Sequence, residues 1–327
     1  MNNQLDEYWH KIDVFQKNVL RKDYPKSYLK QSFSLYNTLK SPESFNGEIS
    51  TEDIFSFTNY EVKGNPFFIH FTSLSSLSKI LQSGFLRMSD FNCLSDKTEL
   101  FFSSELITPL DEKQRLNIIN EKPKIFSLSA CFSNETTLKN EHMWSHYASG
   151  GSGCAIEYQF NEMDIHRMIF GKVQYGKVAL KPLRRIVKNN EDFKNEYNLT
   201  IEDFPMFLLK ISAFHKDIKF KQEEEVRLLF HKDGSMGFNA FFNIEYKDFY
   251  TDNEVRNFIK IPLLNKKDLN YNNPINFPSI KISRVIIGHN NPDPDATISQ
   301  LLEIIKETKI SFEIWLLTKS AKLVKVI

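Results

Sequence analysis

The clearest hydrophobic pattern in the chain is a short apolar run followed directly by helical spacing. The run "FFIHF" (67–71) predicts a strand, and the next segment places apolar residues three and four positions apart. Thr72 or Ser73 is suited to cap the N-terminus of this helix, and Gly84 to end it in the left-handed conformation. "FLRMS" (85–89) predicts a return strand. The apolar face of the helix consists of Leu74, Leu77, Ile80 and Leu81.

The rest of the chain combines apolar strands with a few helices and has no regular strand–helix repeat. This pattern predicts an α+β fold with a mixed or antiparallel sheet. Residues 1–60 show partial helical periodicity and predict a helical N-terminal extension, whereas residues 61–327 predict a single α+β domain. Strands are predicted at 124–133, 153–160, 172–175, 223–230, 284–288 and 311–317, and helices at 141–150, 204–217 and 293–307. The last helix is expected to turn four side chains inward, Ile298, Leu301, Leu302 and Ile305.

The composition mainly excludes certain classes of protein. The 327 residues carry 42 basic and 41 acidic side chains, which argues against a protein that coats nucleic acid or an anionic membrane by bulk charge, although a local basic groove stays open. The 3 cysteines are widely spaced, fit neither a disulfide framework nor a zinc ribbon, and indicate a reducing compartment. The N-terminus lacks the apolar core of a signal peptide, and no apolar run approaches ~18 residues, so we expect a cytoplasmic protein without a membrane span.

The predicted strand "EEEVRLLF" (223–230) carries the most informative polar pattern. With a period of two, Glu223, Glu225 and Arg227 share one face of the strand, and the apolar residues share the other. Two carboxylates and a guanidinium in a row on a rigid element suit a polar ligand. One carboxylate could stabilise an oxocarbenium-like centre while the other accepts a proton. The plainer interpretation is a solvated strand face with cross-strand ion pairs. The apolar set consists of Val226, Leu228 and Phe230.

The remaining polar motifs are weaker. His142 and His146 have zinc-like spacing, but the glutamate of a metalloprotease motif and a clear third ligand are missing, so no metal site is predicted. The loop residues Asp96 and Glu99 are expected to serve a turn or a cap. A lone strand histidine such as His70 is more often a core residue than a catalytic one. No P-loop, dinucleotide fingerprint or serine elbow is present.

Several segments together resemble a bacterial family known as domain-of-unknown-function 2971. The family pattern is a strand with an aromatic or histidine start, an Asn-Asp-x-x-Glu loop, a W-x-x-Y helix leading to a glycine, and an E-x-E-x-R strand. The chain departs from it at Ser95, where the loop usually carries Asn, and at Phe220, where a Trp usually precedes the last strand. The matching segments run in family order over residues 66–320 and comprise "FIHFTSLSSLSKILQSGFLRMS", "NCLSDKTEL", "LSACFS", "MWSHYASGGSGCAIEYQF", "KVQY", "KDIKFKQEEEVRL" and "RVIIG".

The opening "FIHFTSLSSLSKILQSG" also resembles, more remotely, the start of ADP-ribosyltransferase-like proteins, which include DNA-modifying toxins and RNA 2'-phosphotransferases. The resemblance implies that core fold, with NAD as the substrate. It implies that His70 binds the NAD ribose with support from Thr72. It further implies that one of Glu223 and Glu225 is catalytic, because a fixed carboxylate stabilises the cationic ribosyl centre left when nicotinamide departs.

The same resemblance implies contacts to the rest of NAD. Trp144 or Tyr147 would stack on nicotinamide, and Arg87 or Arg227 would contact the pyrophosphate. The expected function is transfer or hydrolysis of ADP-ribose by an intracellular bacterial protein, a toxin or antiphage effector, with protein, DNA, RNA or water as acceptor. The alternatives are a non-catalytic nucleotide- or nucleic-acid-binding module, and an interaction protein whose aromatic N-terminal helices contact a partner.

Overall fold

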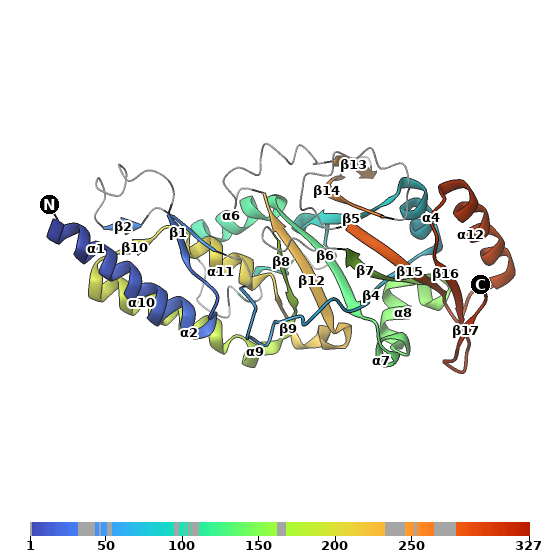
Figure 1. Cartoon of the computed structure of the whole chain (residues 1–327), viewed down its shortest axis with the longest axis horizontal. Helices are drawn as coiled ribbons and strands as arrows, with labels where there is room; N and C mark the ends of the chain where they lie inside the picture. Colours follow the sequence, from blue (N-terminus) through green and yellow to red (C-terminus); the bar gives the residue numbers. More distant parts are fainter. Residues whose placement is uncertain are drawn as a thin grey trace.

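Most of the strands join one mixed sheet of 11 strands, which confirms the predicted α+β class and the mixed sheet. The computed structural model describes residues 2–31, 43–45, 47–50, 54–94, 98–101, 103, 105, 111–161, 168–232, 246–251, 254–264 and 279–327. Within these residues the sheet is antiparallel except where β15 and β16 run parallel, joined by helix α12 (Figure 1). The strand order is β13 (Tyr246–Thr251), β14 (Glu254–Pro262), β5 (Phe85–Asp90), β6 (Ile125–Phe132), β4 (Phe68–Thr72), β7 (Cys154–Asn161), β15 (Ser279–Ile287), β16 (Glu313–Leu317) and β17 (Leu323–Lys325).

The sheet splits beside β6. One edge of β6 pairs from Ile125 to Cys131 with β12 (Glu225–His231), which also pairs with β8 (Ile169–Lys172). The other edge is shared between two strands: β5 pairs with Phe126 and Ser127, and β4 pairs with Cys131 and Phe132. Ser129 lies between these two pairings and has no strand partner on that edge. The split gives the middle of β6 free backbone groups and room for side chains.

Two helices cover one face of the sheet. Helix α4 (Leu74–Ser83) begins as predicted at Ser73, whose hydroxyl accepts a hydrogen bond from the Ser76 amide at 3.1 Å, and ends at Gly84 with φ of 76°. Helix α12 (Pro294–Thr308) begins at Asp293, as predicted. The core under these helices contains Leu77, Leu81, Leu301 and Ile304 together with the apolar face of β12.

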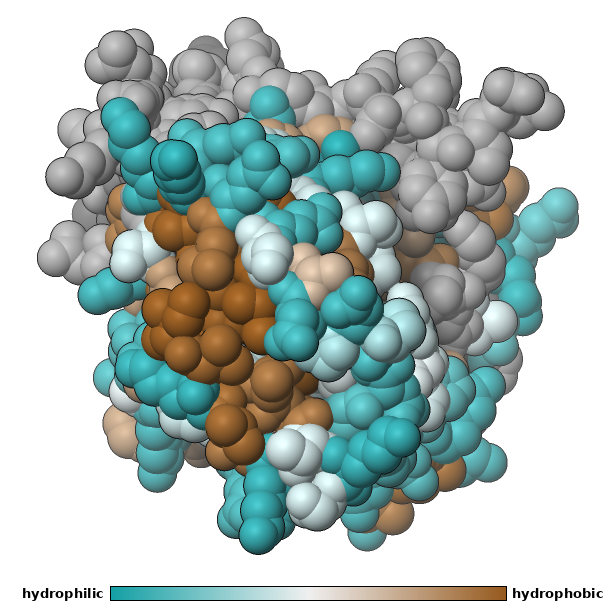
Figure 2. Space-filling model, turned by 90° about the vertical axis from the view of Figure 1, so that its right-hand side faces the viewer, coloured by the Kyte–Doolittle hydropathy of each residue, from teal (hydrophilic) through white to brown (hydrophobic). Residues whose placement is uncertain are grey.

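The outer surface of α12 differs from the prediction. Leu302 was expected to face the core but is 39% exposed, and Ile304 is buried instead. Figure 2 shows an apolar patch on this end of the molecule, where α12 and the C-terminal strands lie. Exposed apolar side chains at this end are Leu302, Val324, Val326 and Ile327.

A second core lies at the opposite end of the molecule, between long helices and the sheet (Figure 1). The N-terminal helix α1 (Asn2–Phe15) packs on α10 (Lys181–Tyr197) and α11 (Phe204–Ser212). The ring of Phe15 lies 5.0 Å from that of Phe193 and 6.2 Å from that of Phe204. Residues 2–23 are helical as predicted, but the rest of the segment predicted to be helical contains the short strands β1 (Leu29–Gln31), β2 (Ser44–Phe45) and β3 (Gly47–Ile49). The boundary at residue 60 stays a prediction.

Shorter elements connect these layers. No helix in the described ranges is both long and apolar enough to cross a membrane. The remaining elements are η1 (Gln16–Leu20), α2 (Arg21–Asp23), β1 (Leu29–Gln31), β2 (Ser44–Phe45), β3 (Gly47–Ile49), η2 (Phe91–Cys93), α6 (Glu112–Glu121), η3 (Lys122–Lys124), α7 (Glu135–Leu138), α8 (Glu141–Tyr147), η4 (Ser149–Gly151), β9 (Gln174–Tyr175), α9 (Gly176–Ala179), β10 (Thr200–Ile201), β11 (His215–Lys216) and η6 (Ile218–Glu223).

Candidate functional site

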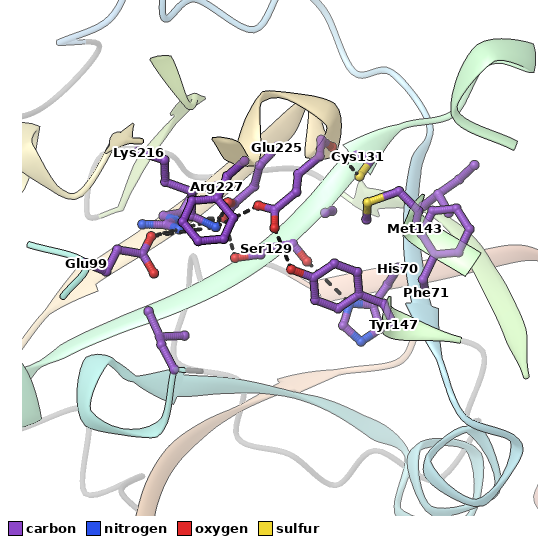
Figure 3. A pocket seen from close by; sticks show the side chains of 15 residues that line it. His70, Phe71, Glu99, Ser129, Cys131, Met143, Tyr147, Lys216, Glu225 and Arg227 are labelled. Carbon is purple, nitrogen blue, oxygen red and sulfur yellow. Dashed lines mark hydrogen bonds and ion pairs between the residues drawn. The ribbon is translucent and has the colours of Figure 1, made fainter. Parts of the chain in front are cut away.

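A pocket of about 200 Å³ opens at the split in the sheet (Figure 3). It lies on the face opposite α4 and α12, because the side chains of β12 that line it alternate with those that pack under these helices. Its walls come from segments that are far apart in the chain: β4, β6, α8, η6 and the start of β12. Five of the residues expected to form the site line it together: His70, Tyr147, Glu223, Glu225 and Arg227.

The strand that carries the glutamates begins later than predicted. Glu224 adopts a left-handed conformation with φ of 45°, so Glu223 ends the 3-10 helix η6 and β12 begins at Glu225. The alternation within β12 is as predicted, because Val226, Leu228 and Phe230 enter the core and Glu225 and Arg227 face the pocket. The polar face is not solvated, since all residues of β12 are buried. The turn at Glu224 nevertheless brings Glu223 into the same pocket.

Glu225 is 4% exposed and is held by partners on both oxygens. Its Oε1 accepts from the Ser129 hydroxyl and from Arg227 Nε at 2.8 Å, and its Oε2 lies 2.6 Å from Lys216 Nζ. Burial alone would raise the pKa of Glu225, but the charges of Arg227 and Lys216 outweigh it and lower the pKa to about 2. Glu225 is therefore a fixed, ionised carboxylate at neutral pH.

Arg227 is fully buried, and each of its three guanidinium nitrogens donates to a protein partner. Besides Glu225, its Nη2 donates to Glu99 Oε1 and its Nη1 donates to the Ala213 carbonyl. Burial disfavours the charged form, but Glu225 and Glu99 raise the pKa of Arg227 above its ordinary value. These three partners hold the buried guanidinium inside the ion-paired network.

Lys216 joins the three carboxylates into one network. Its Nζ lies 2.6 Å from Glu225, 2.8 Å from Glu223 and 3.8 Å from Glu99. Burial opposes its charge, but Glu225 and Glu99 raise the pKa of Lys216, so the amine stays protonated. Within the network three carboxylates face two cations, Lys216 and Arg227. The pocket therefore has a formal charge of one negative unit.

Glu223 is the carboxylate that contacts Tyr147, a partly exposed residue of the pocket wall. Its Oε1 accepts from the Tyr147 hydroxyl at 2.6 Å, its Oε2 contacts Lys216, and its main-chain carbonyl accepts from Cys131 Sγ at 3.0 Å. Tyr147 is 41% exposed, so its ring stands at the pocket entrance. Burial and the hydrogen bond to Glu223 raise the pKa of Tyr147 and keep the hydroxyl protonated. Tyr147 and Glu223 are thus the groups that an entering ligand meets first.

His70 reaches the pocket through the split. Alternation along β4 places it on the face of Phe68 and Thr72, opposite Ile69 and Phe71, but its ring lines the gap beside β6. Burial lowers the pKa of His70, so the ring is neutral at pH 7. A carbonyl only accepts, so Nδ1 carries the proton and donates to the Ser129 carbonyl at 3.3 Å. The other nitrogen, Nε2, is then a hydrogen-bond acceptor with no partner among the described residues.

Three of the expected ligand contacts lie elsewhere. Trp144 is fully buried, donates Nε1 to the Leu138 carbonyl at 2.8 Å and packs on Phe71, so it holds α8 on the sheet. Thr72 is buried at the far end of β4, beside Cys154. Arg87 is exposed and lies over the ring of Phe258 at 4.2 Å. The structure does not bring these side chains to the pocket.

Sequence reasoning missed three members of the network. Glu99, expected to serve a turn or a cap, is 4% exposed and pairs with Arg227; Asp96 and Ser95 lie outside the described residues. Lys216 and Ser129 were not singled out. Charge balance would have indicated a second cation, because a guanidinium alone cannot compensate several buried carboxylates. In the described part of the chain no three potential metal ligands cluster.

The fold and the pocket define an α+β protein with a net-negative, ion-paired pocket at a split in its sheet. Residues 143–228 match the family described as "Protein of unknown function (DUF2971)", which agrees with the resemblance seen in the sequence over that segment. The matched segment contains Tyr147, Lys216, Glu223, Glu225 and Arg227, hence most of the polar network. Searches of curated proteins and of solved structures gave no match.

Proposed function

We propose that the pocket binds the nicotinamide–ribose end of NAD and breaks the bond between nicotinamide and ribose, passing ADP-ribose to an acceptor or to water. The observation that carries this proposal is the convergence of His70, Tyr147, Glu223 and Glu225 on one net-negative pocket. The split in the sheet favours the proposal, because it provides the place where a neutral histidine and two carboxylates meet.

Electrostatics gives Glu225 its proposed role. When the glycosidic bond breaks, its electron pair leaves with nicotinamide, which becomes neutral, and positive charge develops on the ribosyl carbon. A carboxylate that is already ionised and fixed by Ser129, Arg227 and Lys216 stabilises this charge without reorganising. With a pKa of about 2, Glu225 is a poor proton acceptor and a good electrostatic stabiliser.

Glu223 has the second role. An attacking oxygen forms a bond to the ribosyl carbon and must lose its proton, and Glu223 is the carboxylate near the entrance that can accept it. The Tyr147 hydroxyl orients Glu223 through the 2.6 Å hydrogen bond. The acceptor nitrogen Nε2 of His70 suits a ribose hydroxyl, which donates a hydrogen bond to it.

The proposal is tested by nicotinamide release from NAD, with and without protein or nucleic acid as acceptor. Glu225→Gln should reduce the rate by about 10²- to 10³-fold, as expected for the loss of one preorganised electrostatic group. Glu223→Gln should reduce it through the proton-transfer step. The matched control is Glu191→Gln, which removes an exposed glutamate on α10 and should leave the rate unchanged. Unchanged rates in both pocket variants, with circular dichroism confirming their folding, would refute the proposal.

A non-catalytic nucleotide-binding module is the second candidate. It is favoured by the saturation of Glu225, whose two oxygens are both engaged by protein partners. This candidate predicts that NAD raises the thermal stability of the protein while no nicotinamide is released with any acceptor. A ligand at 100 times its dissociation constant adds ~2.7 kcal/mol to the free energy of unfolding, which a melting experiment detects easily.

A further inference from the structure

The interior of the pocket disfavours phosphate. Its two cations, Lys216 and Arg227, are shared among three carboxylates, and the net charge is negative. A phosphate placed inside would face those carboxylates without a free cation. The volume of about 200 Å³ is also below the ~300–1,000 Å³ that small-molecule sites usually offer. Only one end of a dinucleotide fits inside, and the remainder must lie outside.

The lip of the pocket has the opposite charge. The short helix η6 forms the lip and exposes Lys219 and Lys221, and α9 beside it exposes Lys177. The two elements are neighbours, because a Cβ added at Gly176 would lie 3.4 Å from Ile218. These lysines form no ion pair with any residue that the structure describes. We call Lys177, Lys219 and Lys221 the basic lip.

Phe220 connects the interior to the basic lip. Its ring lines the pocket, with Lys216 Nζ 5.5 Å and Lys219 Nζ 4.8 Å from the ring centroid. Lys216 is ion-paired with the buried carboxylates, whereas Lys219 is exposed. The Phe220 ring therefore lies between the ion-paired lysine and the exposed one. A ligand that leaves the pocket past Phe220 meets Lys219 directly.

Acidic residues at the lip do not cancel this charge. The Asp217 side chain caps η6, where it accepts a hydrogen bond from the Lys219 amide at 3.0 Å, and Glu224 is exposed at the turn before β12. The three lysines of the basic lip therefore exceed the two carboxylates, and neither carboxylate forms an ion pair with them. By formal charge, η6 and α9 thus carry one more cation than anion at the lip, whereas the interior carries one more carboxylate than cations.

We infer that Lys219 and Lys221 bind the phosphate groups of the ligand whose ribosyl end enters the pocket. This inference rests on the proposed function and deepens it by fixing the orientation of the substrate. The uncharged ribose lies inside beside Glu225, and the pyrophosphate lies on the basic lip. The pyrophosphate contact expected of Arg87 or Arg227 is thus assigned to lysines that are exposed and form no ion pair with the described part of the chain. Substrates with phosphate next to the ribose should be selected over those without it.

The test compares three ligands that share the nicotinamide ribose: NAD, nicotinamide mononucleotide and nicotinamide riboside. Dissociation constants are measured by calorimetry for wild type, Lys219→Ala, Lys221→Ala and the double variant. Each lysine should contribute up to about fivefold to the affinity for NAD and for the mononucleotide, and less than about twofold for the riboside. Added salt should weaken the binding of NAD and of the mononucleotide but leave the binding of the riboside unchanged. Lys79→Ala, which removes an exposed lysine on α4, is the charge-matched control.

The outcomes separate the inference from the function on which it rests. If wild type binds none of the three ligands, the proposed function fails and the inference fails with it. If wild type binds all three equally, or if the double variant behaves like Lys79→Ala, only the inference is overturned. A single-stranded oligonucleotide that binds wild type but not the double variant, while NAD binds both, would also overturn it, because the basic lip would then serve an acceptor strand.

Discussion

The acid stability of the protein should depend on Glu225 more than on any exposed carboxylate. Its pKa falls from an ordinary value of 4.5 to about 2 in the folded chain, and the residue is only 4% exposed, so solvent screens the effect little. Each pKa unit corresponds to about 1.4 kcal/mol. The depressed pKa therefore contributes about 3 kcal/mol to the free energy of unfolding at neutral pH.

The sign follows from proton linkage. The unfolded chain binds the proton more tightly than the folded chain, so this contribution is complete above about pH 4.5 and is lost as the pH falls towards 2. About 2 kcal/mol should already be lost at pH 3. Glu225→Gln cannot titrate, so it should be less stable than wild type at pH 7 but should approach it as the pH decreases.

The assay is urea unfolding of wild type and Glu225→Gln at a series of pH values between 7 and 3. The difference in their free energies of unfolding should shrink by about 2 kcal/mol over this range. Glu191→Gln, at an exposed position of α10, should follow wild type at every pH. Parallel curves for wild type and Glu225→Gln would refute the reasoning, because they would mean that the carboxylate has the same pKa in the folded and unfolded chains.

Two further substitutions probe the network, and a third probes the backbone packing at Gly288. Arg227→Met leaves Lys216 as the one cation of the network facing three buried carboxylates, and should destabilise the protein by about 3–5 kcal/mol in urea unfolding; a loss below 1 kcal/mol would contradict a buried network. Tyr147→Phe keeps the ring but removes the hydrogen bond to Glu223, so stability should change by only about 1 kcal/mol while nicotinamide release falls; equal release would remove Tyr147 from the proposed mechanism. Gly288→Ala places a Cβ 2.1 Å from the Gly151 carbonyl oxygen, a backbone atom, and should lower the melting temperature through about 1–3 kcal/mol of strain, an effect that a normal melting temperature would disprove.

The sequence was sufficient to predict an element where a single hydrophobic periodicity determines which of its faces is buried. The apolar residues of β12 fix its register, so the sequence correctly placed Glu225 and Arg227 together on the other face. Helix α4 was predictable because its cap, apolar spacing and terminal glycine agree with one another. Helix α10 was not predicted, because only Leu183, Ile186 and Phe193 are buried among its 17 residues and its apolar periodicity is correspondingly sparse.

The site itself could be predicted only in part. Glu99, Ser129 and Lys216 come from a loop and two different strands, and no periodicity relates them to Glu225. These side chains come together with Glu225 because β6 pairs with β12 and because the chain turns at Glu224. Both features belong to the tertiary structure and leave no local pattern in the sequence. Glu223 reached the pocket although it lies outside β12, because the left-handed residue after it redirects the chain.

The split beside β6 also has a consequence for hydrogen exchange. A residue of an antiparallel strand directs its N–H and C=O to the same side, and the Ser129 carbonyl points to His70 in the split. The Ser129 amide therefore opens towards the pocket, whereas the amides of Leu128 and Ala130 point to β12. No hydrogen bond of the Ser129 amide is seen among the described residues, so we expect it to exchange faster than its neighbours in β6 and to become protected when a ligand fills the pocket.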